Sequence, residues 1–307
     1  MYAHARRDYF AYALLLGIGI IWGSQFLFNA KAIRYFPPAT IAASRVLIGA
    51  LTLTAASYFF SERRGGYGSP SIWLLLVAVA FFEVVLPLFL IVWGQQHVDS
   101  SITAVMTGSV PIVTLVLSVF FSEKKHFTLG ASLSVILGLI GMIILVKPSG
   151  NHIGLHNWIY EFAIFTGVVS FALALILFEK VPRDAPIRSV RNILWIASLP
   201  LISVALIFDK PWCLSWNFDG VIALLILGVM SSGLAYVIYA MLIHRRGPVF
   251  TSICGFIVPV VGVLLGVGIR GEHFDAKEML AVILIMSALA LYEMDLFSKL
   301  KFLGKKK

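Results

Sequence analysis

One acid, Glu83, lies inside the apolar stretch AVAFFEVVLPLFLIVWG, and no other charged residue occurs between Arg64 and Asp99. A carboxylate that faces lipid costs about 2.5–3.5 kcal/mol even on lenient insertion scales. Glu83 should therefore face a partner or a water-filled cavity. An acid in such a place carries protons or contacts the cationic part of a bound molecule. Glu83 is thus the first candidate for proton coupling and for ligand binding.

A basic residue, Arg45, lies inside another apolar stretch. At a rise of about 1.5 Å per residue, Glu83 is about 18 Å along a helix from Ser71, near the middle of a core about 30 Å thick. Arg45 is about 9 Å from Ala39, at roughly the same depth if the two helices enter from opposite faces. In one interpretation a Glu83–Arg45 ion pair only locks these helices together. In the other, both face one cavity, where Arg45 binds a carboxylate through its planar guanidinium and Glu83 binds an ammonium.

Three prolines are predicted to break helices near this depth. Pro87 lies four residues after Glu83 and has no amide to bond to its carbonyl. We expect a bend and a free carbonyl beside the acid, with a simple packing kink as the alternative. Pro111 and Pro259 lie near the middle of two later apolar stretches, at matched positions. Such positions are typical of interrupted helices beside a transport site.

Aromatic and small polar side chains form a second group of candidates. Trp22, Gln25 and Phe26 share one helix face, at i, i+3 and i+4 spacing. Aromatic rings there can stack on a flat or cationic ligand, although packing between helices is as common a use. Small polar residues likewise bind ligands or hold membrane helices together. The remaining candidates for substrate binding are Thr107, Ser231, Tyr236, Tyr239 and Phe256, with Asn29 as a weaker one.

The elements that position these residues must cross a membrane, because 60% of the 307 residues are hydrophobic and only 13% are charged. Such a chain cannot hide its apolar surface inside a water-soluble fold. Stretches of about 20 apolar residues cross the hydrocarbon core as helices. We expect an all-α polytopic membrane protein with ten transmembrane helices, near 10–30, 39–60, 71–93, 101–121, 128–146, 157–179, 189–208, 218–243, 249–269 and 277–297.

The net charge of +9 indicates membrane topology rather than nucleic-acid binding. If the N-terminus is cytoplasmic, most of the 24 basic residues fall in cytoplasmic segments. We therefore expect both termini in the cytoplasm, with the basic tail at 305–307 against anionic lipid.

The chain contains two copies of one unit. TAVMTGSVPIVTLVLSVFFSEKKHF from Thr103 aligns with TSICGFIVPVVGVLLGVGIRGEHF from Thr251, and Ser231 takes the place of Glu83 in the second copy. We expect two five-helix repeats, at 1–150 and 151–307. Five is an odd number, so the second repeat is inverted in the membrane. Inverted repeats that rock about a central site are the geometry of alternating access, and a duplicated scaffold without transport is the alternative.

Four segments together carry a resemblance to a known family. They are IIWGSQFLFNAKAI at 20–33, PATIAASRVLIGALTL at 38–53, the stretch 100–146 and its echo at 251–292. In order and spacing they resemble the drug/metabolite transporter superfamily, specifically its EamA-type ten-helix exporters. The resemblance spans nearly the whole chain. It implies a bacterial inner-membrane protein, a central cavity lined by helices one to four and six to nine, and peripheral helices five and ten.

The resemblance leaves the substrate open, because members move amino acids, drugs, nucleotide-linked compounds or other small metabolites. The first hypothesis is a secondary transporter that exports amino acids or related metabolites, by proton exchange through Glu83 or by facilitated diffusion. The alternatives are a facilitator for nucleobases, nucleotide-linked compounds or cationic drugs, a non-transporting structural or receptor protein, and a membrane-embedded enzyme. For an enzyme, however, the loops carry few clustered His, Asp and Ser residues.

No cofactor is expected, because the chain has no P-loop, nucleophile elbow or HExxH motif. The two cysteines and seven histidines indicate no metal cluster. The expected partners are a small-molecule substrate, protons and membrane lipid, with no nucleic acid. A monomer and a homodimer are both left open.

Overall fold

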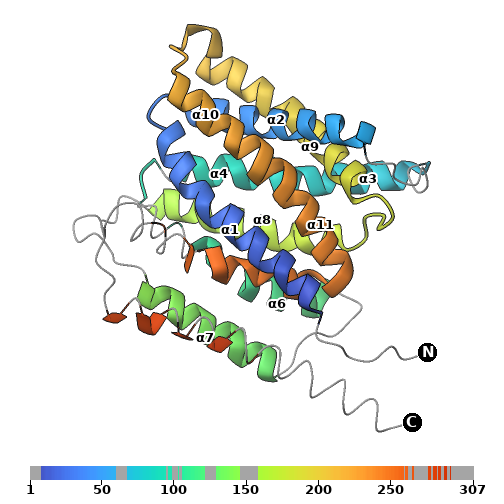
Figure 1. Cartoon of the computed structure of the whole chain (residues 1–307), viewed down its shortest axis with the longest axis vertical. Helices are drawn as coiled ribbons and strands as arrows, with labels where there is room; N and C mark the ends of the chain where they lie inside the picture. Colours follow the sequence, from blue (N-terminus) through green and yellow to red (C-terminus); the bar gives the residue numbers. More distant parts are fainter. Residues whose placement is uncertain are drawn as a thin grey trace.

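A computed structural model describes most of the predicted spans. The residues that it describes are 8–59, 68–94, 96–98, 103, 106–121, 129–145, 158–258, 260–261, 265, 276–277, 279–281, 283–284, 287–288 and 291. Within these ranges every regular element is a helix (Figure 1). Six helical segments are long and apolar enough to cross a membrane: Tyr9–Asn29, Pro38–Phe59, Pro70–Gly94, Trp158–Phe178, Pro186–Asp209 and Phe218–Arg246.

The prediction of an all-helical membrane protein is confirmed for the described residues. Six of the ten expected spans contain a helix of sufficient length and apolar character, and the ten-span architecture stays a prediction. The fourth, fifth and ninth expected spans contain shorter apolar helices, at Met106–Ser118, Ser132–Gly141 and Pro248–Val258. The tenth lies mostly outside the described residues.

The helical elements have the following bounds. They are α1 (Tyr9–Ala32), α2 (Pro38–Phe59), α3 (Pro70–Val79), η1 (Ala80–Val85), α4 (Leu86–Gly94), α6 (Val110–Phe121), α7 (Leu129–Leu145), α8 (Trp158–Phe178), α9 (Pro186–Val204), η2 (Ala205–Asp209), η3 (Pro211–Cys213), α10 (Phe218–Ile226), η4 (Leu227–Leu234), α11 (Ala235–Arg246) and α12 (Pro248–Ser252). The segments η1, η2 and η4 are π-helical, and η3 is a 3₁₀ turn.

Corresponding helices of the two halves begin at a constant distance along the chain. The first residues of α2 and α9 are Pro38 and Pro186, and those of α3 and α10 are Pro70 and Phe218, so both pairs are 148 residues apart. Proline suits the first turn of a helix because the amide that it lacks has no partner there. The π-helical segments η1 and η4 also correspond at this offset. Two elements that depart from α geometry at matched places support the duplication read from the sequence, and π-helical turns often mark functional sites.

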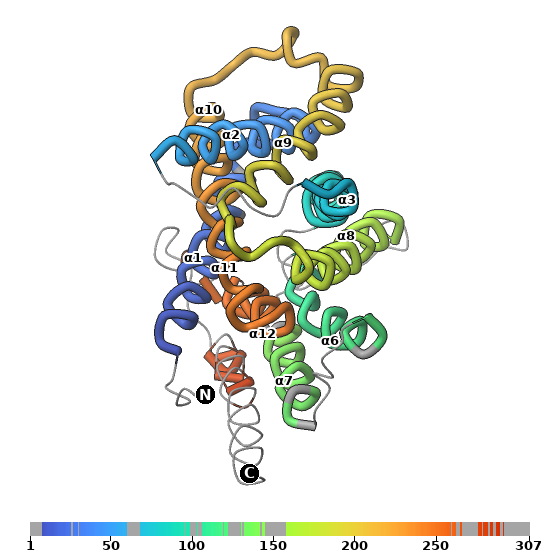
Figure 2. Tube along the Cα trace, turned by 90° about the vertical axis from the view of Figure 1, so that its right-hand side faces the viewer, coloured from blue at the N-terminus to red at the C-terminus, as the bar shows by residue number. Residues whose placement is uncertain are grey.

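The packing pairs elements of one half with elements of the other. At the centre α2 packs against α9, and these two helices lie side by side in both views (Figures 1 and 2). On one side α1 packs against α10 and α11, and on the other α8 packs against α3 and α4. Exchanging each of these helices for its counterpart in the other half (α1 for α8, α2 for α9, α3 for α10 and α4 for α11) gives the same set of contacts. The helix α7 contacts α6 and lies at the edge of the bundle in both views.

Glycines allow α2 to approach η4 closely. A Cβ atom added to Gly228 would lie 2.4 Å from Cβ of Ile48 and 3.1 Å from the backbone oxygen of Arg45. One added to Gly49 would lie 2.9 Å from Cβ of Ser232. The two carbon–carbon distances, 2.4 and 2.9 Å, are far below ordinary van der Waals contact, so only glycine fits without a shift. This close contact is what brings Arg45 beside the π-helical segment of the other half.

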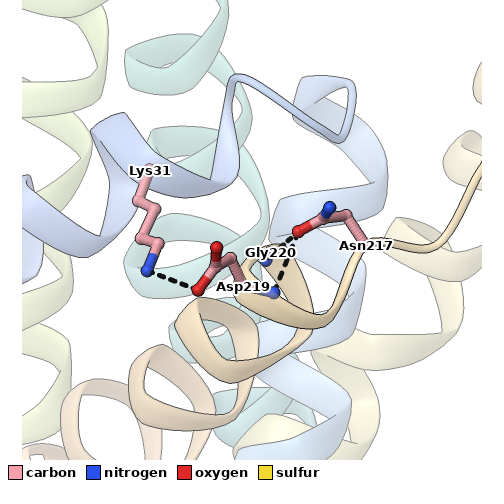
Figure 3. A network of polar contacts seen from close by, with 4 residues as sticks. All are labelled: Lys31, Asn217, Asp219 and Gly220. Carbon is pink, nitrogen blue, oxygen red and sulfur yellow. Dashed lines mark hydrogen bonds and ion pairs between the residues drawn. The ribbon is translucent and has the colours of Figure 1, made fainter.

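Ion pairs connect both ends of α1 to the long helix formed by α10, η4 and α11. At one end Lys31 Nζ lies 2.9 Å from Oδ1 of Asp219, next to the side chain of Asn217 that caps α10 through the amides of Asp219 and Gly220 (Figure 3). At the other end Asp8 caps α1 and accepts hydrogen bonds from Arg245, one of them 2.9 Å long. The bonds from the Arg245 guanidinium hold the pKa of the Asp8 carboxyl below its usual value.

Candidate functional site

A cavity of about 120 Å³ lies between the helices that the sequence marked as important. Its wall comes from α1, α2, η1, α4, α8 and α11, and from described residues of the 106–110 and 252–258 segments. The wall is mostly apolar, so the few polar groups on it determine what chemistry it can support. Seven predicted site residues line it, namely Trp22, Gln25, Arg45, Glu83, Thr107, Tyr236 and Tyr239.

Glu83 lies in η1 and is fully buried, with 0% of its surface exposed. Its Oε2 accepts a long hydrogen bond of 3.4 Å from the hydroxyl of Tyr239. Its Oε1 has no hydrogen-bond partner in the described part of the protein. A buried acceptor without a donor is costly. Because Glu83 lines the cavity, Oε1 is the natural point of contact for a water molecule or a ligand donor.

Arg45 is held on the cavity wall by neutral partners. Its Nε donates to Oγ of Ser232 at 3.1 Å and its Nη2 donates to Oε1 of Gln25 at 2.9 Å. It is 3% exposed. The described residues contain no ion pair between Arg45 and Glu83. The structure therefore shows no bridge between these two residues, and both line one cavity.

The helix deviates from α geometry directly before Pro87, and this changes which carbonyl the proline leaves free. In η1 the amide of Leu86 bonds to the carbonyl of Phe81, five residues earlier. In the same register Pro87 would bond to the carbonyl of Phe82, not to that of Glu83. Oγ of Ser170 donates to the Phe82 carbonyl at 2.6 Å.

The Glu83 carbonyl is also occupied, because the hydroxyl of Tyr236 donates to it at 3.4 Å. The expected free carbonyl beside the acid is therefore wrong. Side-chain hydroxyls satisfy both carbonyls that a proline at this place could release.

A similar hydrogen bond occurs at the matched place in the other half. The indole Nε1 of Trp22 donates to the carbonyl of Ser231 in η4, at 3.1 Å. Trp22 and Ser170 are 148 residues apart, so they occupy equivalent positions on α1 and α8. In each half, a side chain of the first helix thus donates a hydrogen bond to a backbone carbonyl in the π-helical segment of the other half.

Three aromatic rings form one side of the cavity. The ring of Trp22 lies 5.7 Å from that of Tyr236 and 5.2 Å from that of Tyr239, and the two tyrosine rings are 6.1 Å apart at 88°. The indole is fixed by its bond to Ser231, and Tyr239 points its hydroxyl at Glu83. A fixed group of rings beside an acid is a suitable surface for a cation.

Three predicted residues have other roles or stand apart from the cavity. Ser231 is buried, but it contributes its backbone carbonyl to Trp22 rather than lining the cavity. Phe256 is buried against α7, where a Cβ on Gly138 would lie 2.7 Å from its ring. Pro111 does not line the cavity; it is the second residue of α6 and lies near the middle of the apolar helical stretch Met106–Ser118, which a turn at Ser109 interrupts. The side chain of Phe26 and all of Pro259 lie outside the described residues.

Asn29, a weaker candidate from the sequence, also lines the cavity, four residues after Gln25 on the same helix face. Sequence reasoning missed several other cavity residues. Phe171 and Leu175 of α8 lie within one residue of the counterparts of Trp22 and Phe26, so the repeat offset points to them. Three further members, Ser252, Cys254 and Gly255, carry no pattern that would have singled them out.

Comparisons with known proteins agree with this architecture. The chain matches the EamA-like transporter family twice, over residues 9–147 and 158–294. It is 26% identical over 284 residues to the uncharacterized inner membrane transporter YedA of Escherichia coli, which covers 91% of this chain and 89% of that protein. It is 21% identical to the uncharacterized transporter YoaV of Bacillus subtilis, covering 90% and 91% of the two chains.

A third relative, from Salmonella typhimurium, is named as a probable amino-acid metabolite efflux pump and is 22% identical over 93% of this chain and 94% of its own. A crystal structure superposes with a TM-score of 0.77 over 92% of this chain and 98% of the other, at 16% identity, which shows a shared fold. The family model covers most of both halves of this multi-pass membrane protein. The chain belongs to the EamA-like transporter family.

Proposed function

We propose that this protein is a secondary transporter that exports small zwitterions, amino acids or closely related metabolites, across the bacterial inner membrane by alternating access. The observation that carries the proposal is that Arg45 and Glu83 face one cavity without forming an ion pair, and that Oε1 of Glu83 has no partner among the described residues. A buried carboxyl without an ion-pair partner binds a proton unless a cationic group of a ligand takes the place of that proton, and a buried guanidinium with only neutral partners favours an anionic ligand group.

The geometry matches the two ends of a zwitterion. The ligand ammonium would donate to Oε1 of Glu83 and lie against the rings of Trp22 and Tyr239. The ligand carboxylate would accept from the guanidinium of Arg45, whose plane is already fixed by Gln25. Pre-oriented groups of this kind lose little conformational entropy on binding.

The cavity size fits this class of ligand. A buried water molecule needs about 10–15 Å³ of cavity volume. If each non-hydrogen atom of a ligand takes the place of one water molecule, a cavity of about 120 Å³ has room for roughly eight to twelve such atoms. That range includes most amino acids and excludes nucleotide-linked compounds in this conformation. A cationic drug is the second candidate, because the group of aromatic rings beside Glu83 favours cations in general.

Alternating access follows from treating the halves as inverted five-helix repeats at 1–150 and 151–307. The repeated helix starts, the matched π-helical segments and the two-fold match of the family model support this architecture. Cytoplasmic termini follow from the distribution of basic residues.

Proton coupling would use Glu83. A buried carboxyl that binds either a proton or a substrate ammonium exchanges one for the other, which is the requirement for antiport. Pro87 and the preceding π-helical turn would give the carboxyl-bearing segment the freedom to move between the two states.

Purified protein in liposomes tests the proposal. Labelled amino acids should cross with the wild-type protein, and Arg45→Met should reduce flux at least tenfold through loss of the carboxylate contact. Glu83→Gln should abolish the response of export to a proton gradient. Glu161→Gln removes an exposed acid in the first turn of α8 and should behave as wild type. Absence of amino-acid flux, or full flux in both cavity variants, would refute the proposal.

A further inference from the structure

Asn29 on α1 is a buried amide that the described protein leaves without a partner. It is 7% exposed, it lines the cavity, and its Oδ1 has no hydrogen-bond donor among the described residues. The end of α1 does not use this side chain as a cap, because the amide of Ile33 bonds to the backbone carbonyl of Asn29 at 2.9 Å. Burying the amide oxygen of Asn29 therefore costs desolvation free energy that no hydrogen bond among the described residues offsets.

The position of Asn29 relative to the two charges indicates what it would contact. Trp22, Gln25 and Asn29 share one face of α1, at i, i+3 and i+7. Gln25 holds Arg45 at 2.9 Å, and Asn29 lies one turn, about 6 Å, further along the helix. Because Asn29, Arg45 and Glu83 line one cavity, we expect a ligand whose carboxylate and ammonium are bound by Arg45 and Glu83 to place its side chain toward Asn29.

We propose that Asn29 selects substrates whose side chain carries a hydrogen-bond donor, such as a hydroxyl or an amide, over apolar side chains of the same shape. The inference rests on the proposed function and narrows its substrate class. A site built to bond a ligand donor rejects the analogue without it, since the buried acceptor then stays unpaired. Apolar groups that merely fit the cavity provide no such discrimination.

Matched pairs of competitors provide the test. Threonine is compared with valine, and asparagine with leucine, as inhibitors of labelled amino-acid flux in liposomes. Wild-type protein should favour the polar member of each pair by about tenfold or more. Asn29→Leu should bring the ratio to about one or invert it, mainly through better binding of the apolar member. Asn29→Asp keeps an acceptor oxygen and should keep the preference.

Ser24→Ala is the matched control on the same helix. The Ser24 hydroxyl already donates to the carbonyl of Ile21 at 2.9 Å, and Ser24 is not part of the cavity wall. Its removal should leave the ratio unchanged.

Each other outcome overturns the inference in a recognisable way. An unchanged ratio in Asn29→Leu refutes the role of Asn29 and leaves amino-acid export standing. Failure of every amino acid to interact with the wild-type protein refutes the proposed function and this inference together. A lower melting temperature of ligand-free Asn29→Leu would show that the amide has a structural partner, which also refutes it.

Discussion

Substitution of Gly228 by alanine should destabilise the protein, although alanine favours helices. The added Cβ would lie 2.4 Å from Cβ of Ile48, and atoms of this kind need about 3.5–4.0 Å. A Cβ atom cannot be moved by changing a rotamer, so α2 and η4 must separate by about 1 Å. Overpacking of this size costs about 1–3 kcal/mol, more than the roughly 1 kcal/mol that alanine contributes over glycine in a helix.

The same shift should damage the site. The backbone oxygen of Arg45 lies 3.1 Å from the added Cβ, and the 3.1 Å bond between Arg45 and Ser232 spans the same contact. We expect Gly228→Ala to lose both thermal stability and affinity for substrate. Gly17→Ala on α1 is the matched control, because no atom lies within 4 Å of its added Cβ. That variant should be as stable as the wild type or more stable.

Thermal unfolding of the detergent-purified variants, followed by intrinsic fluorescence at one fixed scan rate, measures the difference. The melting temperature of Gly228→Ala should fall by about 5 °C, while that of Gly17→Ala should stay or rise. If Gly228→Ala were as stable as Gly17→Ala, the close contact between α2 and η4 would not exist. The account of how Arg45 is positioned would then fail as well.

Two further predictions concern single contacts. Ser170→Ala should lower the free energy of unfolding by about 1–3 kcal/mol, because the Phe82 carbonyl loses its hydrogen-bond donor. In a Pro87→Ala background the backbone supplies an amide donor, so the same substitution should cost clearly less. Equal costs in the two backgrounds of this double-mutant cycle would contradict the reasoning. Because the pKa of Asp8 is lowered in the folded state, its contact with Arg245 should stabilise the protein above the ordinary Asp pKa of about 3.8 and be lost as the pH falls through the lower folded value. Asp8→Asn should accordingly melt earlier than wild type at pH 7, and the difference should shrink as the pH falls below about 3.8; a difference that does not shrink in acid would refute this assignment.

The sequence predicted the membrane helices well because apolar length is a direct physical requirement of the bilayer. The starts at Pro38, Pro70 and Pro186 lie within three residues of the starts expected from the apolar stretches. The depth count placed Glu83 and Arg45 on a common level, and both line one cavity. Each of these inferences needs only a local pattern and a rise per residue.

Other features depend on contacts between distant segments and left no such pattern. The π-helical register of η1 moves the released carbonyl from Glu83 to Phe82, and nothing in the local sequence fixes that register. Arg45 is bound by Gln25 and Ser232 rather than by Glu83, a choice made by the close approach of α2 and η4. Phe256 has the right depth but faces α7, because helix rotation is set by packing.

The scaffold is repeated, but the charges on the cavity wall come from one half alone. Glu83 corresponds to Ser231, which has no charge and lies outside the cavity wall. At the same offset Arg45 corresponds to Ile193, which has no charge either. The nearest second-half arginine, Arg191, bonds to Ser57 and its neighbour Asn192 and does not line the cavity.

A cavity with both charges on one half imposes a direction on a polar ligand. The first half would hold the ammonium and the carboxylate, while the two tyrosines of α11 supply mainly surface and hydroxyls. A ligand bound this way keeps its orientation relative to the first half while the second half moves past it. Substitutions on the second-half part of the cavity wall should therefore alter rates of interconversion more than affinity, whereas removal of Glu83 or Arg45 in the first half should act on affinity directly.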